Sequence, residues 1–311
     1  MRVTAQLIDA LKGHHLRSER YDRSVKDLFD LQDEIIMKIL TELRVTITED
    51  GAARIHAKGT NNLQAYLKGL EGYGYQNQGT KEGNAEAKRL YQEAMELDPN
   101  YPMAYAGLAH QLYLGLFYGA SESPKETLSN AMKLAQKAVE LDNSSSGAHA
   151  VVSEIFLTMR QHDKAIEAAE RAVTLNPNSS WALRTLANCL FYAGRSEESL
   201  PFSREAIRLD PFFPGTYRFV ALACRETARY EEGIAAVKQS LQLAPKEVFA
   251  RVILVSLYMY AGREDEARAT VAEIQRIAPN FSVEKFAKAL PYKDAATRDR
   301  YIDSLRRAGM K

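Results

Sequence analysis

The sequence of 311 residues predicts a mainly α-helical solenoid, with a small α+β unit at its N-terminus and a capping helix at its C-terminus. The first observation is a ladder of prolines that recur every 34 residues: Pro177, Pro211, Pro245 and Pro279. The second is that several other positions keep the same spacing through four consecutive copies. A fixed period of this length indicates a stack of similar helical units, each packed on its neighbours.

The four regular copies cover residues 146–179, 180–213, 214–247 and 248–281. Positions 8 and 20 of the unit carry mostly small residues, which predicts two helices packed closely together. Position 15 lies between these helices, where a glycine such as Gly194 or Gly262 supplies a positive φ. Position 18 is acidic in every copy, as expected for the first turn of a second helix, where free N–H groups and the helix dipole favour a carboxylate.

In its period, its two-helix unit and its pattern of small residues and proline, the chain resembles the tetratricopeptide repeat (TPR) family. The resemblance implies a right-handed TPR superhelix of about six helix–turn–helix repeats. Two looser copies precede the regular ones, with an insertion near residues 77–83 in the first and a longer loop at 119–124 in the second. We therefore expect an array over residues 63–281, divided into 63–101, 102–145, 146–179, 180–213, 214–247 and 248–281.

Residues 1–45 follow a different pattern. Val3, Ala5 and Leu7 alternate with polar residues, which predicts a half-buried strand, and a turn at 11–14 leads to a second strand over residues 15–21. Ser24 and Asp27 indicate the start of a helix, whose apolar stripe continues to residue 43. Because a hairpin and one helix cannot close a core, we expect this segment to be the end of a larger α/β domain.

The stretches RVTAQLIDA (2–10), ERYDR (19–23), LQDEI (31–35) and LPYKD (290–294) resemble the TolB-like and TPR region of bacterial signalling proteins. Such proteins carry a class III adenylate or guanylate cyclase domain, or a winged-helix DNA-binding domain, at their N-terminus. The resemblance implies a truncated TolB-like remnant at 1–45, a connector at 46–62 and a cap at 282–311. The sequence offers neither the metal-binding aspartates of a cyclase nor a winged helix, so neither activity is expected of this chain.

The predicted cap consists of a short helix near residues 282–290 and a second helix from 294 to about 307. Tyr301, Ile302 and Leu305 form the apolar face of the second helix. The end of a solenoid needs such a segment, with one apolar and one polar face, to cover its last repeat.

Charge and composition exclude several classes of function. Lys and Arg number 41 against 40 Asp and Glu, so no field suited to nucleic acid or a membrane surface is expected. The N-terminus lacks a signal-peptide pattern and no apolar run could span a membrane, which predicts a cytoplasmic protein. The six histidines show no metal-ligand spacing, and Cys189 and Cys224 are expected to be buried. We expect no metal, no cofactor and no catalysis.

In TPR proteins the concave groove is lined by first-helix positions 2, 5, 9, 12 and 13. Aromatic and arginine residues, which are frequent at binding hot spots, occupy many of these positions here. Arg184 and Asn188 resemble two members of the carboxylate clamp of some TPR domains, but Phe219 and Phe249 replace others, so that clamp is not expected. The predicted groove residues are Trp181, Arg184, Asn188, Phe191, Tyr192, Arg218, Arg225, Phe249, Met259, Tyr260, His110 and Tyr113.

The favoured interpretation is a non-catalytic TPR scaffold that binds a peptide or protein partner in this groove. The alternative is the regulatory or positioning half of a truncated or split adenylate cyclase-like or transcription-regulatory protein. A third possibility is self-association through the edge of the N-terminal hairpin, because an unpaired strand edge can pair with another chain. For Trp181 and the tyrosines, packing between repeats is the alternative to ligand binding.

Overall fold

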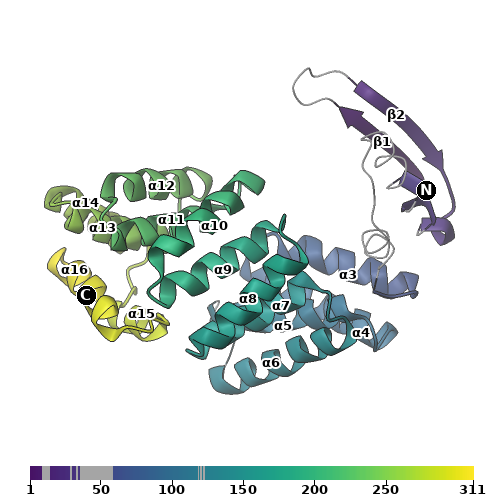
Figure 1. Ribbon diagram of the computed structural model, residues 1–311, viewed down its shortest axis with the longest axis horizontal. Coiled ribbons are helices and arrows are strands. Elements are labelled where there is room, and N and C mark those ends of the chain that lie inside the picture. The colour runs from purple at the N-terminus through teal and green to yellow at the C-terminus, as the bar shows by residue number, and fades with distance from the viewer. Residues whose placement is uncertain are drawn as a thin grey trace.

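The computed structural model describes residues 1–8, 15–28, 30–32, 34–35, 59–117, 119, 121 and 123–311. In this part of the chain, six consecutive helix pairs run from Leu63 to Ile277 and wind into a curved array (Figure 1). The predicted mainly α-helical solenoid is therefore confirmed.

The six pairs share one arrangement, a first helix joined by a short turn to an antiparallel second helix. They are α3 (Leu63–Gln76) and α4 (Lys81–Leu97), α5 (Pro102–Phe117) and α6 (Pro124–Leu141), α7 (Ser146–Thr158) and α8 (His162–Leu175), α9 (Ser180–Tyr192) and α10 (Ser196–Leu209), α11 (Pro214–Glu226) and α12 (Tyr230–Leu243), and α13 (Val248–Tyr260) and α14 (Glu264–Ile277). First helices of successive pairs pack against each other more closely than second helices do, so the first helices line the inner side of the curve.

The proline ladder sets where the second helices end. Each second helix of the four regular repeats stops two residues before its proline, and the intervening residue is extended, as at Asn176 with φ −144° and ψ 89°. A proline ring disfavours the helical conformation of the residue before it, which explains this ending. Asp142 has nearly the same conformation before Asn143, so the slot keeps its geometry without a proline.

The turns between paired helices confirm the predicted positive φ at position 15. The values are 59° at Arg160, 86° at Gly194, 56° at Ala228 and 73° at Gly262. Glycine adopts this region without strain, whereas a side chain there costs about 1–2 kcal/mol. The predicted acidic residues also lie in the first turns of the second helices: Asp163, Glu197, Glu231 and Asp265.

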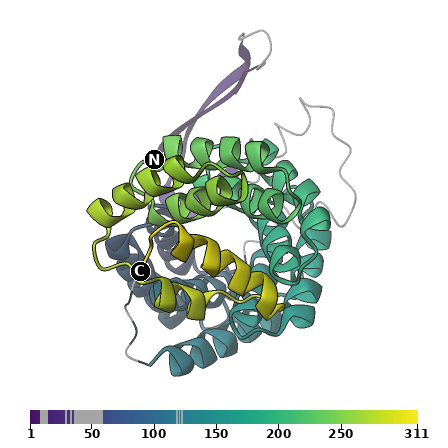
Figure 2. The same cartoon turned by 90° about the vertical axis from the view of Figure 1, so that its left-hand side faces the viewer.

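Two further helices follow the array, α15 (Val283–Ala289) and α16 (Ala295–Arg307). Tyr301, Ile302 and Leu305 are buried, and α16 packs on α13, which confirms the predicted capping helix. However, α15 and α16 also turn into the inner side of the ring, as Figure 2 shows. The period could not predict this return, because it stops at residue 281.

The N-terminal segment forms the predicted hairpin. Strands β1 (Arg2–Ile8) and β2 (His15–Asp22) pair antiparallel, and no third strand joins them in the described part of the chain. A short 3-10 turn, η1 (Val25–Asp27), follows, and residues 28, 30–32 and 34–35 are helical. The predicted turn at 11–14, the remainder of the apolar stripe and residues 46–58 of the connector lie outside the described residues. Self-association through the hairpin stays a prediction.

Candidate functional site

The inner side of the array carries two clusters of polar and aromatic residues. The first, the Glu154 cluster, consists of His110, Tyr113, Glu154, Trp181 and Arg184, from helices α5, α7 and α9, together with Asn188, one turn beyond Arg184 on α9. The second, the Tyr292 cluster, consists of Phe191, Tyr192, Arg225, Ser256 and Tyr292, from α9, α11, α13 and the segment between α15 and α16. The structure thus divides most of the predicted groove residues between two places.

A carboxylate forms the centre of the first cluster. The indole N–H of Trp181 donates to Oε1 of Glu154 over 2.9 Å, and the Thr185 hydroxyl lies 3.4 Å from the same oxygen. Oε2 lies 3.4 Å from Nε2 of His110, but this buried oxygen accepts no well-formed hydrogen bond from the described residues. Oδ1 of Asn188 is likewise buried and accepts none from that part of the chain. The cluster therefore presents two acceptors in need of donors.

Glu154 is absent from the predicted groove residues, although it occupies position 9 of the third repeat, which is one of the groove positions. The repeat register was thus a sufficient signal to find it.

Burial controls the ionisation of the Glu154 cluster. Loss of solvent, reinforced by the Arg184 charge, lowers the pKa of His110 to about 3, so its imidazole is neutral at pH 7. Burial also raises the pKa of Glu154, while the hydrogen bond from Trp181 opposes that shift. Burial lowers the pKa of Arg184, and the nearby charge of Glu154 partly offsets this shift.

The aromatic members of this cluster also pack between repeats. The Trp181 and His110 ring centroids are 4.9 Å apart, and those of His110 and Tyr113 are 6.2 Å apart. Arg184 places its guanidinium 4.1 Å from the ring centroid of Phe213, the N-cap residue of α11. Trp181 is half-buried, and its buried part packs against the core between repeats, which was the alternative to ligand binding.

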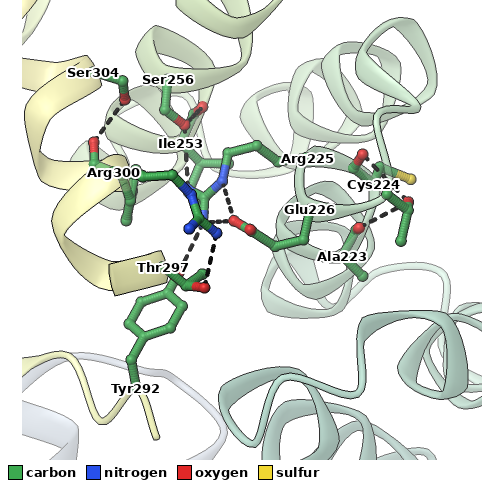
Figure 3. A network of polar contacts seen from close by, with 12 residues as sticks. Ala223, Cys224, Arg225, Glu226, Ile253, Ser256, Tyr292, Thr297, Arg300 and Ser304 are labelled. Carbon is green, nitrogen blue, oxygen red and sulfur yellow. Dashed lines mark hydrogen bonds and ion pairs between the residues drawn. The ribbon is translucent and has the colours of Figure 1, made fainter. Parts of the chain in front are cut away.

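Arg225 forms the centre of the second cluster, shown in Figure 3, and is 1% exposed. Its guanidinium donates to Glu226 and to the Tyr292 phenol, each over 2.7 Å, and lies 3.4 Å from the Ser256 hydroxyl. It also lies 3.8 Å from the ring centroid of Tyr301 on α16. Because an unpaired buried guanidinium is costly, these partners together stabilise the charge.

Tyr292 belongs to residues 288–294, the end of α15 and the loop that follows it, which we call the return segment. Its ring centroid lies 5.5 Å from that of Phe191 and 5.0 Å from that of Tyr192. Burial raises the pKa of Tyr292 to about 12, so the phenol stays protonated. The predicted groove residues Phe191, Tyr192 and Arg225 thus contact the chain's own C-terminal part.

The return segment extends to the third repeat. The backbone N–H of Lys293 donates to the Tyr192 carbonyl over 2.9 Å, and its ammonium donates to Asp163 over 2.9 Å. Arg160 donates to the carbonyls of Lys288 and Tyr292, over 3.1 and 3.5 Å. A cavity of about 520 Å³ lies beside the segment, bordered by Tyr192, Glu226 and Tyr292 among others.

The remaining predicted groove residues are held by other contacts. Arg218 forms an ion pair with Glu247. Phe249 is 48% exposed, with its ring centroid 6.0 Å from that of Phe286. Met259 packs against the core, and Tyr260 lies beside Tyr230.

The described residues were compared with the geometric requirements of a metal site and of a membrane-spanning helix. They include no group of three or more His, Cys, Asp or Glu side chains placed to hold a metal ion. None of their helices combines the length and the apolar character needed to cross a bilayer. Both cysteines are free and buried, as predicted.

Comparison with known proteins supports the repeat assignment. Residues 147–179 match the sequence profile described as "Tetratricopeptide repeat". The chain is similar to the structure titled "Crystal structure of APC/C hetero-tetramer Cut9-Hcn1", with a TM-score of 0.58, 16% identity and coverage of 92% of this chain and 54% of that one. It is also similar to Pseudomonas aeruginosa pilF, with a TM-score of 0.51, 16% identity and coverage of 70% and 93%. These likenesses concern the fold, and the predicted TPR superhelix is confirmed.

One curated relative has a name that suggests an enzyme. Over 165 residues, 53% of this chain, the sequence is 34% identical to "Putative adenylate cyclase 3" of Rhizobium meliloti (strain 1021). The matched region spans only 28% of that protein's length.

Proposed function

We propose that this chain is a non-catalytic TPR scaffold that binds a peptide or protein segment along its concave surface. The observation that carries the proposal is the pair of buried acceptors in the Glu154 cluster, Oε2 of Glu154 and Oδ1 of Asn188. A buried acceptor without a donor costs about 1–3 kcal/mol. Two of them on neighbouring inner helices suit a ligand that brings its own donors.

The chemistry of the cluster favours a cationic or amide donor. A backbone N–H, a lysine ammonium or an arginine guanidinium would complete the coordination of Glu154, and charge-assisted hydrogen bonds are the strongest of these. Trp181 and Tyr113 supply rigid aromatic surface beside the carboxylate, which is common at the centre of binding sites. Asn188 would accept a further N–H along an extended backbone.

Peptide selection on the full chain tests the proposal. A random displayed library is selected on the protein, and the affinity of an enriched peptide is then measured for the wild type, Glu154→Gln and Asn188→Ala. The matched control is Glu140→Gln on the outer helix α6, where the glutamate is exposed beside Lys137. Melting temperatures establish first that every variant folds.

We expect Glu154→Gln to weaken binding at least tenfold and Asn188→Ala several-fold, with Glu140→Gln unchanged. Binding that is equally tight for the wild type and both inner-side variants would contradict the proposal. So would a selection from which no peptide emerges.

A second candidate function is the regulatory or positioning part of a longer signalling protein, such as an adenylate cyclase-like or transcription-regulatory one. The identity with the Rhizobium meliloti protein favours it. In this case the array would position a catalytic or DNA-binding domain. Sequencing the DNA directly upstream of the Met1 codon tests the idea: an in-frame cyclase or winged-helix region supports it, and an unrelated gene contradicts it.

A further inference from the structure

We propose that the return segment, residues 288–294, occupies in cis a binding site for an extended partner segment that carries a tyrosine followed by a lysine. A partner would bind repeats three to five by displacing this segment. The inference rests on the proposed function, and it adds a partner class and a form of regulation.

The return segment does more than a cap requires. A solenoid cap covers the last repeat, and α16 does so by burying Tyr301, Ile302 and Leu305 on the side of α13. The return segment instead reaches Arg160 and Asp163 in the third repeat. These contacts lie three repeats before the end of the array, where capping has no need of them.

The Tyr292 pocket is built to recognise a phenol. The Arg225 guanidinium donates to the phenol oxygen, and the rings of Phe191 and Tyr192 lie edge-on to the Tyr292 ring, with interplanar angles of 70° and 81°. Edge-to-face packing is a preferred arrangement of aromatic pairs. A buried tyrosine paired with an arginine is also the kind of contact that dominates binding energy at interfaces.

The backbone contacts hold the main chain of the return segment, from the last turn of α15 to Lys293, independently of its side chains. The Tyr192 carbonyl accepts the Lys293 N–H, and Arg160 donates to the carbonyls of Lys288 and Tyr292. Main-chain hydrogen bonds of this kind supply affinity in peptide recognition, while pockets supply specificity. A partner segment with the same spacing would satisfy the same groups.

The lysine contact replaces a bridge between repeats. The position-18 carboxylates Glu197 and Glu231 pair with Arg229 and Arg263 of the following repeats. In the third repeat the corresponding carboxylate is Asp163. Arg195 of the following repeat bonds to Glu198 instead of to Asp163. Asp163 pairs with Lys293 of the return segment.

The Asp163–Lys293 pair is well suited to exchange. The Asp163 and Lys293 side chains are 89% and 51% exposed, and exposed ion pairs contribute little to stability. The 520 Å³ cavity beside Tyr292 gives an incoming segment access to the phenol pocket. The return segment is thus held firmly at Tyr292 and weakly at Lys293.

The test uses a fluorescein-labelled peptide KALPYKDAA, the sequence of residues 288–296, and the full chain throughout. Anisotropy titrations compare the wild type with the double variant Tyr292→Ala, Lys293→Ala, which retains α16. A tethered segment competes at an effective concentration in the millimolar range. We therefore expect the peptide to bind the double variant at least tenfold more tightly than the wild type.

Two controls define the specificity. A peptide with alanine in place of the tyrosine should bind the double variant at least tenfold more weakly. Adding Asp163→Lys to the double variant should also weaken binding of the original peptide several-fold. If the double variant does not fold, Tyr292→Phe replaces it, since the lost hydrogen bond to Arg225 loosens the segment while the ring still fills the pocket.

Equal affinity for the wild type and the loosened variant would overturn the inference, as would no binding to either. The library peptides keep this result separate from the proposed function. If those peptides still bind in a Glu154-dependent way but KALPYKDAA binds to neither protein, the return segment does not occupy a partner site. The scaffold function would still stand. If neither kind of peptide binds, both proposals fall.

Discussion

The guanidinium of Arg225 donates a 2.7 Å hydrogen bond to the phenol oxygen of Tyr292, 67 residues further along the chain. Arg225 is buried, so this bond supplies one of the few acceptors within reach of its charge. The contact joins the fifth repeat to the return segment and makes the C-terminal part of the chain a component of the concave surface.

Removing the Tyr292 hydroxyl should destabilise the fold measurably. Tyr292→Phe leaves Arg225 with Glu226 and Ser256, and the loss of a hydrogen bond to a charged group costs about 1.5–3 kcal/mol of unfolding free energy. The matched control is Tyr217→Phe, which removes a 3.0 Å hydrogen bond to the Pro211 carbonyl at an exposed site. In urea unfolding, the loss of unfolding free energy for Tyr292→Phe should be at least twice that for Tyr217→Phe. Equal losses would contradict the strength assigned to the hydrogen bond between Arg225 and Tyr292.

The turn at Ala228 should accept glycine with a gain in stability. The residue has φ 56°, where the strain of a side chain costs about 1–2 kcal/mol. Glycine removes this strain, but it loses more conformational entropy on folding, which costs about 0.5–1 kcal/mol. Ala228→Gly should therefore raise the free energy of unfolding by about 0.5–1 kcal/mol. Gly262→Ala occupies the same slot, meets no atom within 4 Å and should lower it by a similar amount. Thermal unfolding that moves both variants in the same direction would refute this account.

Gly107 should tolerate no side chain. A Cβ there would overlap the ring of buried Tyr91, which packs between the first two repeats. Overpacking of this kind costs about 1–3 kcal/mol. Gly74→Ala is the control, because nothing lies within 4 Å of its Cβ and alanine favours the helix by up to about 1 kcal/mol. Denaturation midpoints should fall for Gly107→Ala and stay level or rise for Gly74→Ala; the reverse order would contradict the close packing.

His110 should make stability depend on pH below neutrality. Its pKa is lowered from 6.5 to about 3 in the folded chain, so the unfolded chain binds a proton in this window that the folded chain does not. Stability is then fully present above pH 6.5 and falls as the pH drops towards 3. Between pH 7 and pH 5, the wild type should lose about 2 kcal/mol more than His110→Gln. If the unfolding free energies of the two proteins changed equally between pH 7 and pH 5, the lowered pKa of His110 would be refuted.

The periodic features were accessible from sequence because each follows from local chemistry repeated at a fixed spacing. Pro177 predicts a helix end through its own ring, and Gly194 predicts a positive φ through its missing Cβ. Asp163 predicts a helix start through the free N–H groups there. None of these inferences needs knowledge of a distant part of the chain.

The return segment lies beyond such inference. Its contacts join Tyr292 to Arg225 and Lys293 to Asp163, and the second pair is separated by 130 residues. A repeat pattern fixes neighbours within the array but not where a chain leaving the array goes. Arg225 was accordingly predicted as a free groove residue, whereas the structure buries it beneath the segment that follows the array.

The measurement that tests the central claim most directly is amide hydrogen exchange of the Lys293 N–H, which donates to Tyr192 within the groove. Exchange is followed in the full chain, alone and saturated with KALPYKDAA or a library peptide that contains Tyr-Lys. We predict faster exchange at Lys293 in the complex and unchanged exchange at Leu305 in the capping helix. Unchanged protection of Lys293 in a saturated complex would contradict the account, because the groove and the return segment would then not compete.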